Sequence, residues 1–151
     1  MNVLIGVGNP YRRDDGVGPL VADQVARRGG NAVQSDGEPA GMLLAWENAD
    51  LAIVVDAVVC EPSTPGRVHR TSVDELPLAG GAPSSHGLGI PEAVALGRAL
   101  GRMPARLVVL AVEAADISLG TGLSPAVAAA LPALVSQAMA ELSGGRAFGP
   151  C

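Results

Sequence analysis

The chain has 151 residues, 48% of them apolar, and a formal net charge of −5. This length is typical of one ordinary domain with its own core, so we expect residues 1–151 to form a single domain. The longest apolar stretches, residues 51–60 and 107–112, are shorter than the roughly 20 residues that a membrane-spanning helix needs. The acidic balance, without a basic cluster, argues against a nucleic-acid partner.

The apolar run at the N-terminus has no basic residue before it and ends at Gly, Asn and Pro, as a strand that enters a turn would. This pattern is not that of a signal peptide, so we expect a cytoplasmic protein without membrane contact.

Apolar periodicity along the chain predicts alternating strands and helices. Short runs rich in β-branched residues predict buried strands at residues 2–7, 32–35, 51–59 and 106–112, and an alternating pattern predicts an edge strand at 67–73. Helical spacing predicts helices at residues 16–28, 40–48, 92–101 and 124–142, the last with Ser124 as N-cap and Pro125 at its first position. This alternation indicates an α/β fold, with a mainly parallel sheet between helices.

Three acidic residues follow or end the predicted parallel strands. Asp15 follows the first strand, Asp36 follows the second, and Asp56 lies in the last part of the third. Because ligands bind beyond the carboxyl ends of parallel strands, we expect the three acids to open onto one edge of the sheet. A carboxylate among Ile, Val and Ala, as at position 56, needs an arginine, hydrogen-bond donors or a cation as its partner.

Other polar residues have simpler interpretations. Either Asp14 or Asp15 is expected to cap the first long helix, which leaves the second carboxylate unexplained. His69 has the alternating context of an exposed strand position, whereas His86 lies in a loop rich in Gly and Ser that leaves its ring free. Two carboxylates and an imidazole, Asp15, Asp56 and His86, form a ligand set suited to a divalent metal.

Two competing chemistries are weaker. The loop at residues 6–11 resembles a dinucleotide-binding turn, but Tyr11 occupies the place that needs a small residue, and acids stand where a pyrophosphate would approach. Cys60 is a nucleophile candidate with His86 as its base, although a cysteine that follows two valines is typically a small buried hydrophobe. We expect both Cys60 and Cys151 to be free thiols.

These residues together resemble the nickel-iron hydrogenase maturation endopeptidases. The resemblance rests on GVGNPYRRDDGVG at the start, on Asp36-Gly37 followed by residues 40–42, on the strand IVVDAVV, on the turn at residues 65–66, on residues 85–89, and on the helix opened by residues 123–125. One departure is the pair Glu38 and Pro39, where the family commonly has Gly and Thr, which puts the flexibility of the Asp36 loop and a direct role of Asp36 in question.

The resemblance implies a fold and a function. The fold is a twisted five-stranded sheet between helices. The function is removal of a C-terminal extension from the precursor of a hydrogenase large subunit once nickel has been inserted. The implied metal site is Asp15, Asp56 and His86, which recognises nickel supplied by the substrate, and Asp36 and Asp15 are the candidate catalytic carboxylates. A non-catalytic nickel-binding or chaperone-like maturation protein is the alternative.

Overall fold

The computed structural model describes residues 1–73 and 89–144, whose strands form one five-stranded sheet. The strands are β1 (Asn2–Val7), β2 (Ala32–Ser35), β3 (Leu51–Val58), β4 (Val68–Ser72) and β5 (Arg106–Glu113). They lie in the order β2-β1-β3-β5-β4, with every neighbouring pair parallel except β4 and β5. The expected mainly parallel sheet, with an edge strand near residues 67–73, is therefore confirmed.

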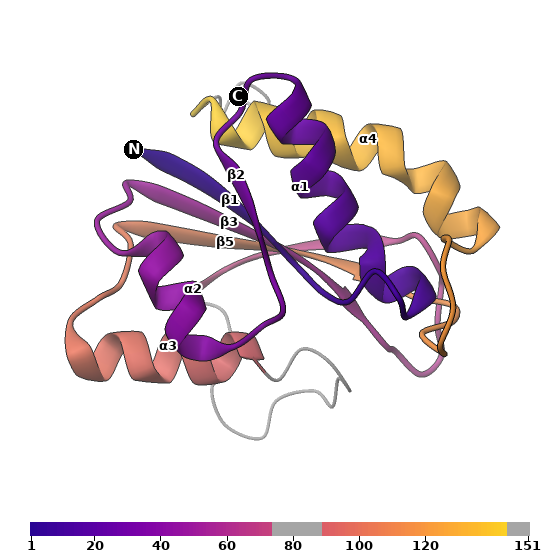
Figure 1. The fold of residues 1–151 in the computed structure, drawn as a ribbon, viewed down its shortest axis with the longest axis horizontal. Helices are drawn as coiled ribbons and strands as arrows, with labels where there is room; N and C mark the ends of the chain where they lie inside the picture. The colour runs from indigo at the N-terminus through magenta and orange to yellow at the C-terminus, as the bar shows by residue number, and fades with distance from the viewer. Residues whose placement is uncertain (74–88, 145–151) are drawn as a thin grey trace.

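Helices cover both faces of this sheet, which confirms the three-layer arrangement. The helices are α1 (Val17–Arg27), α2 (Pro39–Trp46), α3 (Gly89–Leu100) and α4 (Pro125–Leu142). Figure 1 shows α1 and α4 on one face and α2 and α3 on the other. The sheet therefore separates two apolar clusters, one beneath each helix pair.

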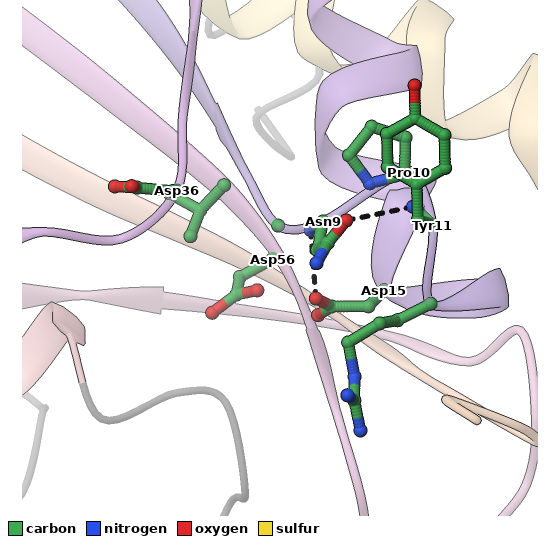
Figure 2. A pocket seen from close by; sticks show the side chains of 9 residues that line it. Asn9, Pro10, Tyr11, Asp15, Asp36 and Asp56 are labelled. Atoms are coloured by element: carbon green, nitrogen blue, oxygen red, sulfur yellow. Dashed lines mark hydrogen bonds between the residues drawn. The ribbon is translucent and has the colours of Figure 1, made fainter. Parts of the chain in front are cut away.

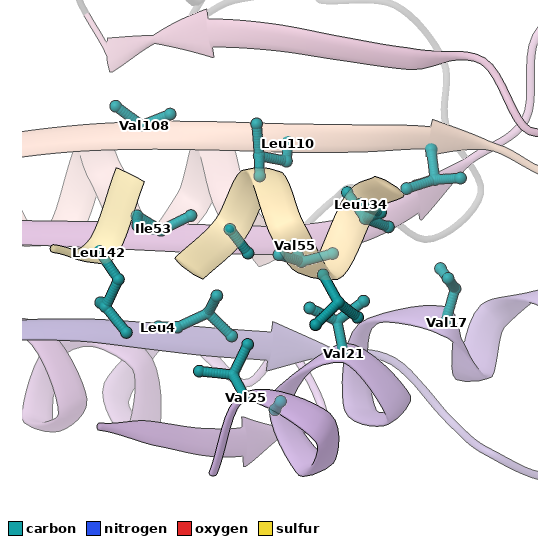
Figure 3. Close-up of a cluster of buried hydrophobic side chains, with 14 of the residues drawn as sticks. Leu4, Val17, Val21, Val25, Ile53, Val55, Val108, Leu110, Leu134 and Leu142 are labelled. Atoms are coloured by element: carbon teal, nitrogen blue, oxygen red, sulfur yellow. The ribbon is translucent and has the colours of Figure 1, made fainter. Parts of the chain in front are cut away.

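The alternation of side chains along each strand supplies both clusters. In β3, Ile53 and Val55 pack under α1 and α4 (Figure 3), whereas Ala52 and Val54 pack under α2 and α3. A strand that is apolar on both faces is the sequence signature of a buried parallel strand. The continuous apolar run of β3 therefore places this strand at the centre of the sheet.

Helix α4 is the one helix, within residues 1–73 and 89–144, that is long and apolar enough to cross a membrane by length and composition. Its Leu134 and Val135 are buried in the cluster that α4 shares with α1 and β3. Packing onto the sheet thus accounts for the buried side of α4, which makes up 28% of the helix.

Two glycines let α1 lie directly on the sheet. A methyl group on Gly18 would lie 2.3 Å from the carbonyl oxygen of Val7 and 2.6 Å from that of Val55. A methyl group on Gly6 would lie 2.1 Å from the Gly18 carbonyl oxygen. The first turn of α1 can rest against β1 and β3 only because both positions are glycine. This contact brings the segment before α1 to the carboxyl end of β3.

Candidate active site

A cavity of ≈ 340 Å³ opens at the carboxyl ends of β1 and β3. In the sheet, β2 lies on one side of β1 and β3 lies on the other. The connections that follow β1 and β2 therefore run in opposite directions, and the cavity lies at the point where the strand order reverses. Ligands of open α/β sheets bind at such points. The cavity is lined by Val7, Gly8, Asn9, Pro10, Tyr11, Arg12, Asp15, Asp36 and Asp56. The expectation that the three acids share one edge is confirmed.

Asp56 is a buried carboxylate that lacks a protein partner in the described part of the chain. Its side chain is 1% exposed, and neither Oδ1 nor Oδ2 makes a hydrogen bond there. Burial, and then the negative charge of Asp15, raise the pKa of Asp56 from 3.8 to about 8. The Ala57 backbone N–H offsets part of this rise without completing a hydrogen bond. The arginine partner that the sequence left open is not found among the described residues.

Asp15 lies beside Asp56 and is held by the loop that follows β1. The Asn9 backbone N–H donates to Asp15 Oδ2 at 2.9 Å, and Asp15 is 2% exposed. Figure 2 shows the carboxylates of Asp15 and Asp56 next to each other, contributed by different segments of the chain. Gly8, with a φ of +147°, lets the loop pass close to Asp15, since a methyl group there would lie 1.9 Å from the Asp15 carbonyl oxygen.

Neither Asp14 nor Asp15 caps α1, so the capping prediction was wrong. Both lie in a short 3₁₀ turn (Arg13–Gly16), and the N-cap of α1 is Gly16, which has no side chain to bond with. Asp14 instead turns away from the cavity, because it is not among the lining residues and its oxygens bind the loop before α4. It accepts hydrogen bonds from the backbone N–H groups of Ala115, Asp116 and Ser124 and from the Ser124 hydroxyl, at 2.8, 3.1, 2.7 and 2.8 Å.

The two adjacent acids therefore have separate surroundings. Asp14 joins the first loop to the N-terminus of α4, where Ser124 is the N-cap and Pro125 the first helical residue, as the sequence predicted. The Ser124 hydroxyl donates its hydrogen bond to Asp14 and makes no side-chain capping bond to α4. Of the two acids, only Asp15 lines the cavity.

Asp36 lies at the rim of the cavity and is exposed. Its Oδ1 accepts a hydrogen bond from the Glu38 backbone N–H at 3.0 Å, and Figure 2 shows its carboxylate turned away from Asp15 and Asp56. Glu38 caps α2 by accepting from the Ala40 and Gly41 N–H groups, and Pro39 is the first helical residue. The unusual Glu38-Pro39 pair thus begins a helix, and the Asp36 loop is held by a turn.

The third expected metal ligand, His86, lies outside the described residues, as does Cys151. Among the residues that are described, no group of three or more His, Cys, Asp or Glu side chains is arranged to hold a metal ion. Asp15 and Asp56 are therefore the described part of the expected set. The three carboxylates that line the cavity also disfavour a pyrophosphate there, which argues further against dinucleotide binding.

A second buried carboxylate, Glu113, was missed by the sequence analysis. It ends β5, is 4% exposed, and accepts from the Thr64 N–H at 2.6 Å while His69 Nε2 lies 2.6 Å from its other oxygen. The Thr64 N–H and His69 lower the pKa of Glu113, against the effect of burial. His69 is thus not simply an exposed strand position. The sequence contained a signal for Glu113, because an acid in the last part of an apolar strand is the pattern that also marked Asp56.

Cys60 lies near this carboxylate as a free, partly buried thiol. Burial raises the pKa of Cys60, and the charge of Glu113 raises it further. A nucleophilic cysteine needs the opposite environment, one that favours the thiolate. The surroundings of Cys60 therefore argue against the covalent alternative.

Comparisons with known proteins agree with the geometry. The family model described as hydrogenase maturation protease matches residues 37–141. The hydrogenase 2 maturation protease of Escherichia coli K12 is 28% identical over 146 residues, covering 93% of this chain and 89% of that protein. The hydrogenase expression/formation protein HupD of Bradyrhizobium diazoefficiens is 32% identical over 122 residues, 76% of this chain and 63% of that protein.

Solved structures show the same fold. The hydrogenase maturating endopeptidase HybD from E. coli superposes with a TM-score of 0.82 at 22% identity, covering 96% of this chain and 93% of that one. The [NiFe] hydrogenase maturation protease HybD from Thermococcus kodakarensis gives 0.81 at 23% identity, covering 93% and 98%. With more than half of its length matched by the family model, the chain belongs to the hydrogenase maturation protease family.

Proposed function

We propose that this protein is an endopeptidase that removes a C-terminal extension from the large subunit of a nickel-iron hydrogenase after nickel has been inserted. Membership of the family supports the peptidase activity and the large-subunit precursor as substrate. The nickel is part of the substrate, so the purified protein need not hold a metal. A cytoplasmic location remains a prediction.

The observation that carries the metal-recognition step is the state of Asp56. Both of its oxygens are buried acceptors without a hydrogen bond in the described residues, and Asp15 lies beside it. Leaving a carboxylate in this state costs free energy that a divalent cation would recover. Carboxylate oxygens and imidazole nitrogens suit such cations, and the family resemblance adds His86 as the third ligand. The residues present therefore fit the proposed metal.

The peptide-cleaving role falls to the carboxylates at the same cavity. Asp36 is exposed at the rim, where a peptide segment can reach it. We assign Asp36 to binding the peptide or transferring a proton, and Asp15 to a catalytic role besides metal recognition. A metal that is presented by the substrate and completed by this protein would restrict cleavage to precursors that have already been loaded.

The test is incubation of the purified protein with precursor that is either nickel-loaded or nickel-free, with the products weighed by mass spectrometry. We expect the parent to shorten only the loaded precursor. Asp56→Asn should fold and fail to cleave. Asp50→Asn is the matched control, because Asp50 is an exposed acid just before the opposite end of the same strand, paired there with the N-terminal amine. It should cleave like the parent.

Two other results would contradict parts of the proposal, one the catalytic activity and the other the metal site. A stable complex with the nickel-loaded precursor, without shortening, would support the non-catalytic maturation protein instead. Calorimetry with nickel or cadmium then tests the ligands directly, on the parent and on Asp15→Ala, Asp56→Ala and His86→Ala. Binding that is unchanged in all three variants would contradict the metal site.

A further inference from the structure

Two adjacent arginines in the loop before α1 have different surroundings. Arg12 lines the carboxylate cavity, and its Nε is buried without a hydrogen bond in the described residues. The Nε of Arg13 is likewise buried without a hydrogen bond in the described residues, but Arg13 does not line this cavity. Its Nε lies 3.7 Å from Asp116 Oδ2, and its guanidinium lies against Gly120. A methyl group on Gly120 would be 2.6 Å from Arg13 Cζ. Arg13 thus has a structural role that Arg12 does not share.

The backbone that carries Arg12 is held on both sides. The Arg12 N–H donates to the Asn9 carbonyl oxygen at 3.0 Å, and the Asp15 N–H donates to the Arg12 carbonyl oxygen at 3.0 Å. The neighbouring residues pair with Gly120, through Gly120 N–H to the Tyr11 oxygen at 2.9 Å and Arg13 N–H to the Gly120 oxygen at 3.0 Å. Arg12 is therefore presented at the cavity by a loop whose position is already set.

The positively charged guanidinium of Arg12 cannot bind a cation. That role would belong to the carboxylates of the cavity. The guanidinium carries five N–H donors and no acceptor, so it would meet a ligand in the cavity through an oxygen of that ligand. Asp15, Asp36 and Asp56 give the cavity an acidic lining, which disfavours an acidic side chain of the substrate. A neutral oxygen of the peptide is therefore favoured, and every residue of a peptide offers one as its main-chain carbonyl.

We propose that Arg12 positions the precursor by donating hydrogen bonds to a main-chain carbonyl oxygen of the segment that enters the cavity. This role rests on the proposed endopeptidase function. It makes Arg12 a positioning residue, separate from the metal-recognising carboxylates. Binding of the peptide would also satisfy the buried donor that the described structure leaves without a partner.

The experiment compares Arg12→Ala, Arg12→Lys and the matched control Arg13→Ala in processing of the nickel-loaded precursor at varied precursor concentrations. Loss of a charged hydrogen bond to the peptide should lower kcat/KM of Arg12→Ala by about tenfold to a hundredfold, mainly through KM. Arg12→Lys should retain part of the activity. Arg13→Ala should lose some thermal stability and keep the KM of the parent.

Guanidinium ion at millimolar concentration provides a readout that a structural role would not move. It should restore cleavage by Arg12→Ala and leave Arg13→Ala unchanged. Parent-like kcat/KM in Arg12→Ala, or a loss that guanidinium does not restore while Arg12→Lys is equally impaired, would overturn the role of Arg12. A parent protein that does not cleave would overturn the proposed function and this role with it, so the two failures are distinguishable.

Discussion

Asp56 and Glu113 are buried carboxylates near the carboxyl ends of adjacent parallel strands, and their pKa values move in opposite directions. In the β3·β5 register, Glu113 pairs with Val58, two residues beyond Asp56. Glu113 is bonded to the Thr64 N–H and to His69, and its pKa is lowered. Asp56 has no such donors in the described residues, and its pKa is raised to about 8. Glu113 thus receives its hydrogen bonds from the fold, whereas the described residues offer none to Asp56.

Asp56→Asn should stabilise the protein increasingly as the pH rises from about 4 to about 8. The folded-state pKa of about 8 exceeds the ordinary value of 3.8, so within this window the unfolded chain has released a proton that the folded protein retains. The parent therefore loses stability with rising pH, by at most about 1.4 kcal/mol per pH unit, and the amide does not. Urea unfolding of both proteins between pH 4.5 and 8.5 measures the difference. A destabilising Asp56→Asn would indicate an ion pair instead.

Glu113→Gln should show the opposite trend. The lowered pKa of Glu113 means that its ionised form stabilises the fold. That stability is present above the ordinary pKa of 4.5 and is lost as the pH falls through the lower folded-state value. The variant should be less stable than the parent at pH 7, and the gap should narrow below pH 4.5. A gap that stays constant across the acidic range would show that Glu113 acts through packing.

Asp14→Ala should be strongly destabilising, although Asp14 does not reach the cavity. Its removal leaves three backbone N–H groups, those of Ala115, Asp116 and Ser124, without their acceptor. Each such group costs about 1–3 kcal/mol when it stays buried, so we expect a loss of about 3 kcal/mol or more in chemical denaturation. Asp14→Asn, which keeps an acceptor oxygen, should lose less. Equal losses in the two variants would argue that charge, and not hydrogen bonding, is what matters.

Gly18→Ala should destabilise the fold by about 2 kcal/mol or more, because the methyl group meets the main chain of β1 and β3, which cannot yield as a side chain can. Cleavage should fall as well, since displacing α1 moves Asp15 relative to Asp56. Gly41→Ala is the control, since its methyl group would lie 3.4 Å from Glu38 Oε1 at the start of α2. It should be neutral or stabilising by up to about 1 kcal/mol. Similar thermal melts for both variants would contradict the close contact.

Cys60→Ser should leave cleavage of the nickel-loaded precursor near that of the parent. Burial and the charge of Glu113 raise the pKa of the Cys60 thiol, so the thiolate is disfavoured at neutral pH. The substitution should cost at most about 1–2 kcal/mol from burying a hydroxyl. Thiol alkylation of the parent should likewise leave cleavage intact. Complete loss of cleavage in a folded Cys60→Ser protein would restore the covalent mechanism.

The sequence alone was sufficient for the order and type of the elements. Apolar runs rich in β-branched residues and helical spacing are local signals, and they placed β3 and α4 within a few residues of their observed bounds. The position of Asp15, Asp36 and Asp56 at one edge also followed from the sequence, because parallel strands bring their carboxyl ends together. The roles of Asp15, Asp56 and His86 remain predictions.

Only the tertiary structure distinguished residues whose local signals are alike. Asp14 and Asp15 are identical neighbours in the sequence, yet one binds the loop before α4 and the other lines the cavity. Asp56 and Glu113 both lie near the carboxyl ends of apolar strands, but the donors Thr64 and His69 come from another segment of the chain and reach Glu113 alone. Hydrogen-bond partners and burial depend on long-range packing, which short-range periodicity does not encode. The sequence therefore determined which groups reach the sheet edge, and the fold decided which of them are already satisfied.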